Sequence, residues 1–355
     1  MSLFTRYISF LYLKSFLIVF VSLECFFVLI DFVKYLDSMP DSANLVVLLL
    51  FYSFIYASNF ILPLSLVLSQ IVFIIVLLKS SQFTAFLSLG YSKARIFNPI
   101  FAISFLITIF YILLNTTSFA YAREKMDLIV EQGFISSFKK DLFVKYNNNY
   151  IYFEKIFPLL QSASNVKIYE MRDNVTIRRI IESKEARFDG VDWILDSAKI
   201  TTIDDDVSHN KPLQVSYEEN FKTLNKFKPK ILDNIYEKHG SVSIVDAYEA
   251  IELLKTQGVN IDKLRGSLYY LLFFPFFAPL AMVCLSNFTP NSNRYVSLGF
   301  VGFIMILCVL MLWGIFFSFS RLSMSGFLAP EFSILLPMFI LFLCSCYFYN
   351  KLLRN

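Results

Sequence analysis

Hydrophobic residues form two blocks in this chain of 355 residues, and a long polar segment separates the blocks. Between Arg123 and Arg265 lie 45 of the 60 charged residues, whereas the flanking blocks consist mainly of long apolar runs. A helix needs about 20 consecutive apolar residues to cross a bilayer. Six runs approach or exceed that length: residues 10–32, 45–78, 97–119, 268–285, 296–319 and 332–349. The pattern predicts three membrane spans, an inserted water-soluble domain and three further spans.

Basic residues in the short loops predict the orientation, because cytoplasmic loops carry more lysine and arginine. With six spans, both termini lie on one side of the membrane. The basic residues that fall on that side are Arg6, Lys79, Lys93, Arg95, Arg294, Lys351 and Arg354. The short loops on the opposite side contain only Lys34 and Arg321, beside Asp37, Asp41 and Glu331. We therefore expect cytoplasmic termini and a polar insert outside the cytoplasm.

The polar insert has the pattern of an all-β domain. Residues 143–146 and 150–153 predict two strands around a turn of three asparagines. Further short runs rich in β-branched and aromatic residues cover residues 166–169, 175–181, 186–188, 193–195 and 213–217. Several short strands with turn signals between them favour an antiparallel sandwich or an open barrel. Residues 243–255 then predict a helix that Ser243 caps and Gly258 ends.

These changes of pattern predict the domain boundaries. Residues 1–121 hold the first three spans, with a short cytoplasmic helix near residues 80–90. Residues 122–240 form the β domain, residues 241–265 a helix and connector, and residues 266–355 the last three spans. The expected fold class is a polytopic α-helical membrane protein with six transmembrane helices and an inserted extracytoplasmic all-β domain.

Composition agrees with a membrane protein and excludes several classes of function. A hydrophobic share of 56% and a mean hydropathy of +0.58 exceed what a soluble domain can bury. The net charge of +4 is small, so we expect no nucleic-acid binding. His209 and His239 lie far from the five cysteines, so neither a metal site nor a cofactor is expected. The chain has no Walker A loop, nucleophile elbow or HEXXH motif, so we expect no enzymatic activity.

Three ionisable residues of the first span are candidate functional residues, because charged groups are costly in hydrocarbon. Glu24 lies deepest, and Asp31 and Lys34 lie near the outer interface. Since Asp31 and Lys34 are three positions apart on one helix, they either pair with each other or contact a polar headgroup.

The loop between the second and third spans, residues 79–95, contains Phe83, Phe86, Leu87 and Leu89 before Gly90. Their spacing predicts a short amphipathic helix that Gly90 ends. Such a helix either rests on the lipid surface or docks into a cytoplasmic motor subunit. The pattern alone is compatible with both.

Four stretches carry a resemblance to a known family. They are Arg6-Tyr7-Ile8, FILPLSLVLSQIVFIIVLLKSSQFTAFLSLGYSKARI, FVKYNNNYIYFEKI and SVSIVDAYEAIELLKTQG. In their order and spacing, over essentially the whole chain, they resemble the lipopolysaccharide-export permease family LptF/LptG, formerly YjgP/YjgQ. The asparagines at 147–149 and the helix start at Ser243 are closer to LptG.

The resemblance implies a permease subunit of an ABC transporter, in the inner membrane of a bacterium, that extracts lipopolysaccharide and passes it to a periplasmic bridge. The implied partners are an LptB-like cytoplasmic ATPase dimer, a paralogous LptF-like permease and an LptA/LptC-like bridge protein, and the insert would be a periplasmic β-jellyroll. The loop helix would be the coupling helix, with contact residues Gln82, Phe83, Phe86, Leu87, Gly90 and Arg95. Because the family often has Glu in place of Gln82, docking here is expected to depend more on Phe83 and Phe86, and Phe83→Asp is expected to abolish ATPase binding.

A glycolipid requires apolar surface for its acyl chains and cations near the outer interface for its phosphates. The expected lipid-binding residues are Asp31, Lys34, Arg123 and Arg321, with Asp31 standing where the family tends to carry Lys. The expected residues of the jellyroll interior are Phe143, Tyr150, Tyr152, Ile168 and Trp193, for each of which ordinary sheet core is the alternative. The alternative function is a non-transporting scaffold that couples an ATPase to periplasmic partners.

Overall fold

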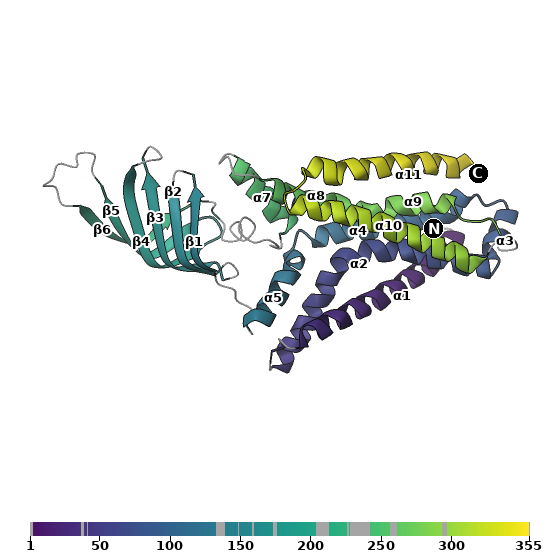
Figure 1. The fold of residues 1–355 in the computed structure, drawn as a ribbon, viewed down its shortest axis with the longest axis horizontal. Helices are drawn as coiled ribbons and strands as arrows, with labels where there is room; N and C mark the ends of the chain where they lie inside the picture. Colours follow the sequence, from purple (N-terminus) through teal and green to yellow (C-terminus); the bar gives the residue numbers. More distant parts are fainter. Residues whose placement is uncertain are drawn as a thin grey trace. The chain divides into compact units, whose positions relative to one another are not determined.

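Long helices account for the two hydrophobic blocks, and one sheet accounts for most of the insert (Figure 1). The computed structural model describes residues 3–36, 39–40, 42–132, 139–147, 149–157, 160–172, 176–203, 213–225, 227, 242–255, 261–292 and 297–354. The chain divides into a helical unit (Met1–Met126, Ser241–Ile251 and Asn260–Asn355) and a β unit (Asp127–Gly240 and Glu252–Val259). Asp37, Asp41, His209, His239, Gly258 and Arg294 lie outside the described residues.

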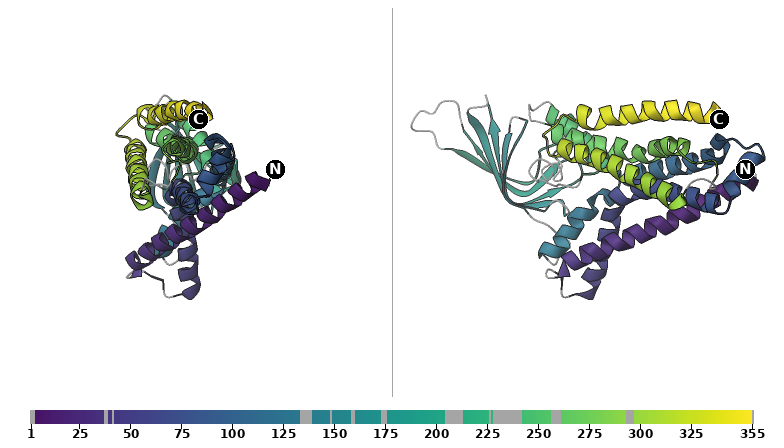
Figure 2. Two further views of the ribbon diagram at one scale, coloured as in Figure 1. Left: turned by 90° about the vertical axis from the view of Figure 1, so that its right-hand side faces the viewer. Right: turned by 45° about the vertical axis from the view of Figure 1, so that its right-hand side comes forward.

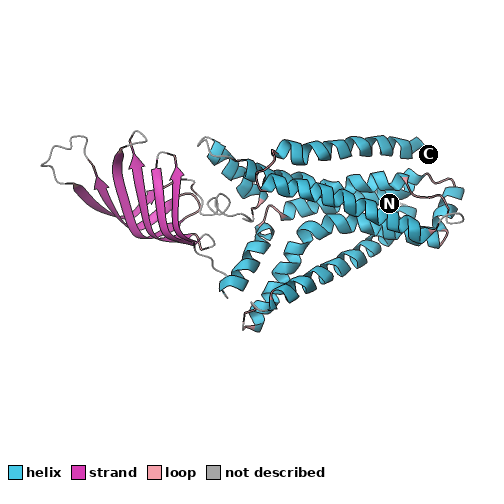
Figure 3. Cartoon of the chain, viewed as in Figure 1, coloured by secondary structure: helices cyan, strands magenta, loops and turns pink. Residues whose placement is uncertain are grey.

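In the part of the chain that the structure describes, six helical stretches are long and apolar enough to cross a membrane, which confirms the six predicted spans. In chain order they are α1 (Leu3–Lys34), α2 (Ala43–Lys79), α4 (Lys93–Leu114), α8 with α9 (Asp262–Phe273 and Phe277–Asn287), α10 (Leu298–Met324) and η4 with α11 (Glu331–Leu335 and Leu336–Arg354). The shorter helices are α3 (Gln82–Ser88), η2 (Ser118–Tyr121), α5 (Ala122–Gln132) and α7 (Ile244–Lys255). Figure 3 shows that helices and strands are confined to separate parts of the chain.

Two of the spans depart from regular α-helix next to a proline. Pro275 lies in the 3-10 turn Phe274–Phe276 (η3) that separates α8 from α9, because proline lacks the N–H that a continuous helix would use there. Pro330 precedes the π-helical turn η4 that opens the last span. Pro63, in contrast, lies inside the continuous helix α2.

The helix α2 is the most buried of the spans, and its polar side chains bond to its neighbours. The side-chain amide of Gln70 donates to the Met282 carbonyl at 3.1 Å and to Ser286 Oγ at 2.8 Å, both on α9. On another side, α1 lies along α2 (Figure 2), and Tyr12 Oη donates to the Leu66 carbonyl at 3.1 Å. These bonds satisfy polar groups that would be costly in hydrocarbon, and they fix α2 between α1 and α9.

The sheet of the β unit is an antiparallel meander in the order β1-β2-β3-β4-β5-β6. Its strands are β1 (Lys139–Tyr146), β2 (Asn149–Phe157), β3 (Ser162–Met171), β4 (Ile177–Phe188), β5 (Trp193–Thr202) and β6 (Gln214–Thr223). The predicted asparagine turn joins β1 to β2, where Asn147 adopts a φ of 53°. Residues 186–188 form the end of β4 and not a strand of their own.

The two faces of the sheet have different chemistry, because successive side chains of a strand point to opposite faces. One cross-strand row on the inner face is Val144, Ile151, Ile168, Ile181, Ile200 and Ser216. The aliphatic members of that row are buried, together with Phe153, Phe188 and Trp193. Trp193 Nε1 donates to the Phe227 carbonyl at 2.7 Å, so its polar atom is satisfied within the core.

Candidate functional site

The loop between α2 and α4 forms the predicted short helix, α3. Its start and end are set by left-handed backbone at Ser81, with a φ of 55°, and at Gly90, with a φ of +83°. The Gly90 conformation favours glycine because a side chain there would be strained. The predicted stop at Gly90 is therefore confirmed, and α3 is a separate element at one end of the helical unit.

Phe83 faces the helical unit and not the solvent. It is 1% exposed, and its ring lies 6.0 Å from that of Phe97 on α4. Phe86 and Leu87 are half-buried against the same core. Three of the expected contact residues thus anchor α3 to the spans and leave little of their surface for a partner.

The first turns of α1 also hold α3 in place. Tyr7 Oη donates to Gln82 Oε1 at 2.8 Å. Phe4 stacks on Tyr91 at 4.4 Å and meets Phe86 edge-on at 5.1 Å. In the first turn of α4, the guanidinium of Arg95 lies 4.7 Å from the centre of the ring of Tyr91, which belongs to the loop after α3. Gln82 and Arg95 are therefore engaged within the chain.

The surface that α3 leaves exposed consists of Ala85, Ser88, Leu89 and Gly90, and we call it the α3 tip. Leu89 is 73% exposed, more than any other large apolar residue of the loop. The sequence pattern contained Leu89 but did not single it out, because an amphipathic pattern cannot show whether the apolar face turns toward the spans or away from them. The contacts of Phe83 and Phe97 decide this.

The polar residues of α1 bond to α2. Ser58 Oγ donates to Glu24 Oε1 at 2.9 Å, and Ser53 Oγ donates to Asp31 Oδ2 at 2.9 Å. Both carboxyl groups are buried. Asp31 is thus bonded to α2, and Lys34 to the neighbouring Tyr35.

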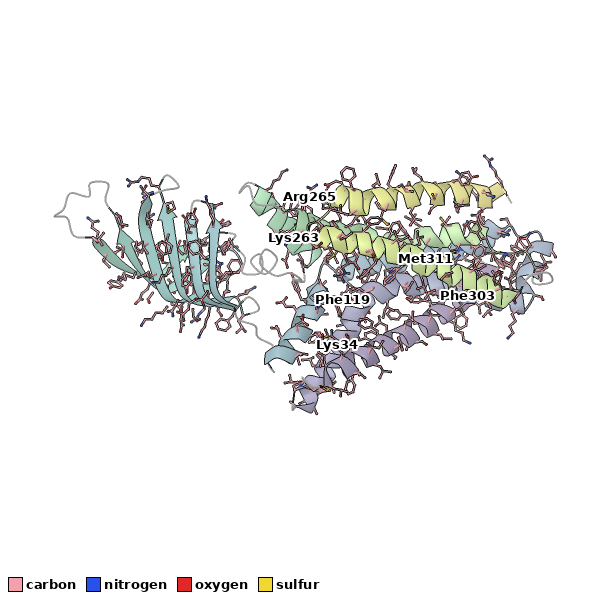
Figure 4. The ribbon with its side chains drawn as sticks, viewed as in Figure 1. Lys34, Phe119, Lys263, Arg265, Phe303 and Met311 are labelled. Carbon is pink, nitrogen blue, oxygen red and sulfur yellow. The ribbon has the colours of Figure 1, made fainter. Side chains whose placement is uncertain are left out.

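Lys34 ends α1 at the same end of the helical unit as Lys263 and Arg265, which lie near the start of α8 (Figure 4). Lys34 Nζ donates to Tyr35 Oη at 3.3 Å. Arg265 forms ion pairs with Asp262 and with Glu331. Sequence reasoning did not single out Arg265, because it belongs to a segment with many charges of both signs.

Arg123 and Arg321 stand at the two ends of a ladder of aromatic rings, which we call the ring ladder. Arg321 lies 4.9 Å from the Phe317 ring, and Phe317 lies 6.2 Å from Phe60. Phe60 lies 4.9 Å from Tyr56, whose ring is 5.1 Å from the Arg123 guanidinium. Arg123 also donates to Tyr56 Oη. The structure thus connects two of the four expected lipid-binding residues through three aromatic rings.

The start of α7 is fastened to the end of α4 and to η2. Tyr121 Oη donates to the Asp246 carboxylate and accepts from the Ser243 N–H at 3.3 Å. The Ile244 N–H donates to the Asn115 carbonyl at 3.1 Å. Burial and the neighbouring Asp246 carboxylate both raise the pKa of Tyr121, so its hydroxyl remains a donor. We call this set of bonds the α7 clasp.

The register of the sheet divides the five residues expected in the jellyroll interior. Ile168 and Trp193 lie on the inner face, where both are buried. Phe143, Tyr150 and Tyr152 lie on the outer face, because they alternate with the buried residues of β1 and β2. The sequence indicated the strands but not which of their two faces turns inward.

Two comparisons with known proteins bear on these features. No curated protein matches the chain. The family model described as "Lipopolysaccharide export system permease LptF/LptG" matches residues 6–351, which include both helical blocks and the inserted sheet. The chain is therefore a multi-pass membrane protein of the inner membrane, and it belongs to the LptF/LptG family of lipopolysaccharide export permeases.

Proposed function

We propose that this chain is an LptG-like permease subunit of an ABC transporter that extracts lipopolysaccharide from the inner membrane. In this proposal a separate LptB-like ATPase dimer supplies the energy, an LptF-like permease is the second membrane subunit, and an LptA/LptC-like bridge receives the lipid. The family match over residues 6–351 carries the proposal. Both termini and α3 are cytoplasmic, and the β unit is periplasmic.

The α3 tip is the surface that meets the ATPase. The packing of Phe83 against Phe97 makes α3 rigid relative to the spans, so a displacement of the tip is passed on to them. Leu89 supplies an apolar side chain for a pocket of the partner. Gln82, Phe83, Phe86 and Arg95 act as positioning residues, since each bonds to or packs on the chain itself.

The ring ladder and Lys34 bind the phosphorylated headgroup. Arginine forms bidentate bonds with phosphate, and an aromatic ring holds a guanidinium in place through a cation–π contact. Arg123 and Arg321 are both held in this way. Asp31 is bonded to Ser53, so its role is to hold α1 to α2 and not to contact the phosphates of the lipid.

The inner face of the sheet takes the acyl chains. Its central row is aliphatic, and Phe153 and Trp193 add rings that lie 5.4 Å apart. These side chains are buried against one another, so acyl chains enter only when the inner face opens.

Affinity purification of the tagged full-length chain in mild detergent, with mass spectrometry of the bound proteins and lipids, tests the proposal. Recovery of a cytosolic ABC ATPase, a second six-span permease and lipopolysaccharide is the expected result. An ATPase without glycolipid would favour the scaffold function, and recovery of none of the three would refute the proposal.

A further inference from the structure

The outer face of the sheet carries two rows of side chains that run across all six strands. One row is Lys145, Tyr150, Tyr169, Ile180, Thr201 and Val215. The other row is Phe143, Tyr152, Lys167, Glu182, Lys199 and Tyr217. We call these positions the outer band.

The outer band is unusually aromatic for the solvent face of an antiparallel sheet, which is normally polar. Phe143 is 53% exposed and Tyr217 is 76% exposed. The rings of Phe143 and Tyr150 stack at 5.7 Å, and Tyr152 and Tyr169 occupy neighbouring positions of the two rows. Because strands lie about 4.8 Å apart, the rings of β1, β2 and β3 form one aromatic cluster, and Tyr217 lies at the far end of its row on β6. Exposed apolar surface of this kind marks a binding site.

The charged side chains of the outer band favour an anionic ligand. The band contains Lys145, Lys167 and Lys199 but one acid, Glu182. Lys167 and Glu182 form an ion pair at 3.0 Å, with both side chains more than a third exposed. Exposed pairs of this kind are weak, so Lys167 can exchange Glu182 for an anionic ligand. The neighbouring Asp141 accepts a bond from Tyr152 at 2.5 Å and is thereby engaged.

We infer that the outer band binds the saccharide part of the exported glycolipid, an oligosaccharide that carries phosphate or carboxylate groups. The C–H face of a sugar ring packs on the electron-rich face of an aromatic ring, and the lysines of the band meet the acidic substituents. The inner face of the same sheet is apolar, and its described buried core carries no charged side chain, so the two faces match the two halves of the glycolipid. The inference rests on the proposed function and assigns the saccharide to the face that the acyl chains do not use.

Ser216 and Tyr217 provide a matched pair for a cross-linking test, because they are neighbours on β6, both are exposed, and they point to opposite faces. A photo-reactive amino acid is placed at either position in the full-length chain, in cells that make complete lipopolysaccharide and in cells whose lipopolysaccharide has a truncated saccharide. We expect Tyr217 to cross-link to lipopolysaccharide only in the first strain, and Ser216 to cross-link in both.

The outcomes separate this inference from the proposed function. Cross-linking at Ser216 with none at Tyr217, or a protein adduct at Tyr217, would overturn the outer-band assignment alone. No glycolipid adduct at either position, in either strain, would overturn both. An adduct at Tyr217 that is unchanged by truncation would show that the outer face contacts lipid and would also overturn the assignment.

Direct binding provides a second measurement. The purified full-length chain is titrated with lipopolysaccharide from which all acyl chains have been removed. The double variant Tyr150→Ser/Tyr169→Ser is expected to bind this oligosaccharide at least about tenfold more weakly, because two stacking surfaces are lost. Arg187→Ser, an exposed cation of the sheet outside the outer band, is the control and should leave affinity unchanged. Equal losses in the two variants would show that the loss is not specific to the rings of the outer band, and would refute the inference.

Discussion

Substitutions of Leu89 and Phe83 distinguish a residue that docks a partner from a residue that stabilises the fold of α3. Leu89→Asp places a charge on a side chain that is 73% exposed, so the expected change in unfolding free energy is within about 0.5 kcal/mol. Phe83→Ala removes a ring that is 1% exposed, and truncation of such a ring costs about 3–5 kcal/mol. The two variants therefore differ in stability by several kcal/mol, although the residues are six positions apart.

Leu89→Asp has little effect on stability, but we expect it to have a large effect on ATPase binding. Burial of a leucine side chain in a partner's pocket contributes about 1.5–3 kcal/mol, which corresponds to roughly 10- to 100-fold in affinity. A charge in that pocket adds a desolvation cost. We expect Leu89→Asp to abolish co-purification of the ATPase while the melting temperature stays at that of the unchanged chain. Phe83→Ala is expected to lower the melting temperature first and to lose the ATPase as a consequence.

The assay measures the ratio of ATPase to permease after purification, the ATPase rate of the assembly and the melting temperature of the permease. Leu160→Asp is the control, because Leu160 is 62% exposed and lies in the β unit. If Leu89→Asp retains the ATPase at the normal ratio and rate, the α3 tip does not contact the partner and the coupling-helix assignment fails.

The burial of Phe83 also changes how a loss of ATPase binding in the Phe83→Asp variant is interpreted. The sequence predicts that this variant loses ATPase binding because a charge disrupts the docking face. In the structure the introduced carboxylate would be buried beside Phe97, without a partner, and would destabilise the packing of α3. Loss of the ATPase in this variant therefore has to be judged together with the melting temperature.

Three further predictions concern the helical unit. Tyr121→Phe removes the donor to the carboxylate of α7, and we expect it to lower stability by about 1–3 kcal/mol and to speed amide hydrogen exchange at the start of α7. Arg123→Ala and Arg321→Ala are each expected to reduce photo-cross-linking of lipopolysaccharide to the ring ladder several-fold, with normal melting temperatures; unchanged cross-linking in both would refute the headgroup site. Ser58→Ala leaves the buried carboxyl of Glu24 without its donor, so we expect the free energy of unfolding to fall by about 1–3 kcal/mol and the melting temperature to fall with it, whereas the Ser58→Ala/Glu24→Leu variant should recover most of the loss.

Much of the fold follows from the sequence, because the bilayer imposes long apolar runs that are easy to recognise. All six spans and the strands at 143–146, 150–153 and 193–195 correspond to described elements. The break of the fourth span at Pro275 was not predicted, since residues 268–285 form one apolar run. Likewise, the π-helical turn at the start of the last span has no signal in hydrophobicity.

The site residues were harder to predict, because each depends on which face of its helix or strand the side chain occupies. In segments rich in aromatic residues, the hydrophobic pattern does not show this face. In β2 the residues from Tyr150 to Phe153 are all apolar or aromatic, so no alternation shows that Ile151 and Phe153 turn inward. In α3, Phe83 and Leu89 are both apolar, yet one is buried and the other exposed. Only the contacts made by other elements, such as Phe97 on α4, distinguish them.

The helix α1 is bonded to α3 near its first turn and to α2 nearer its other end, so it connects these two elements of the helical unit. Near its first turn, Tyr7 bonds to Gln82 of α3. Near its last turns, Glu24 and Asp31 bond to Ser58 and Ser53 of α2. Because α2 is fixed by its own bonds to α9, a displacement of α3 acts on α1 at one end while α2 resists it at the other. The two carboxyl–serine bonds are buried and the Tyr7–Gln82 bond is exposed, so α1 is held more firmly to α2 than to α3.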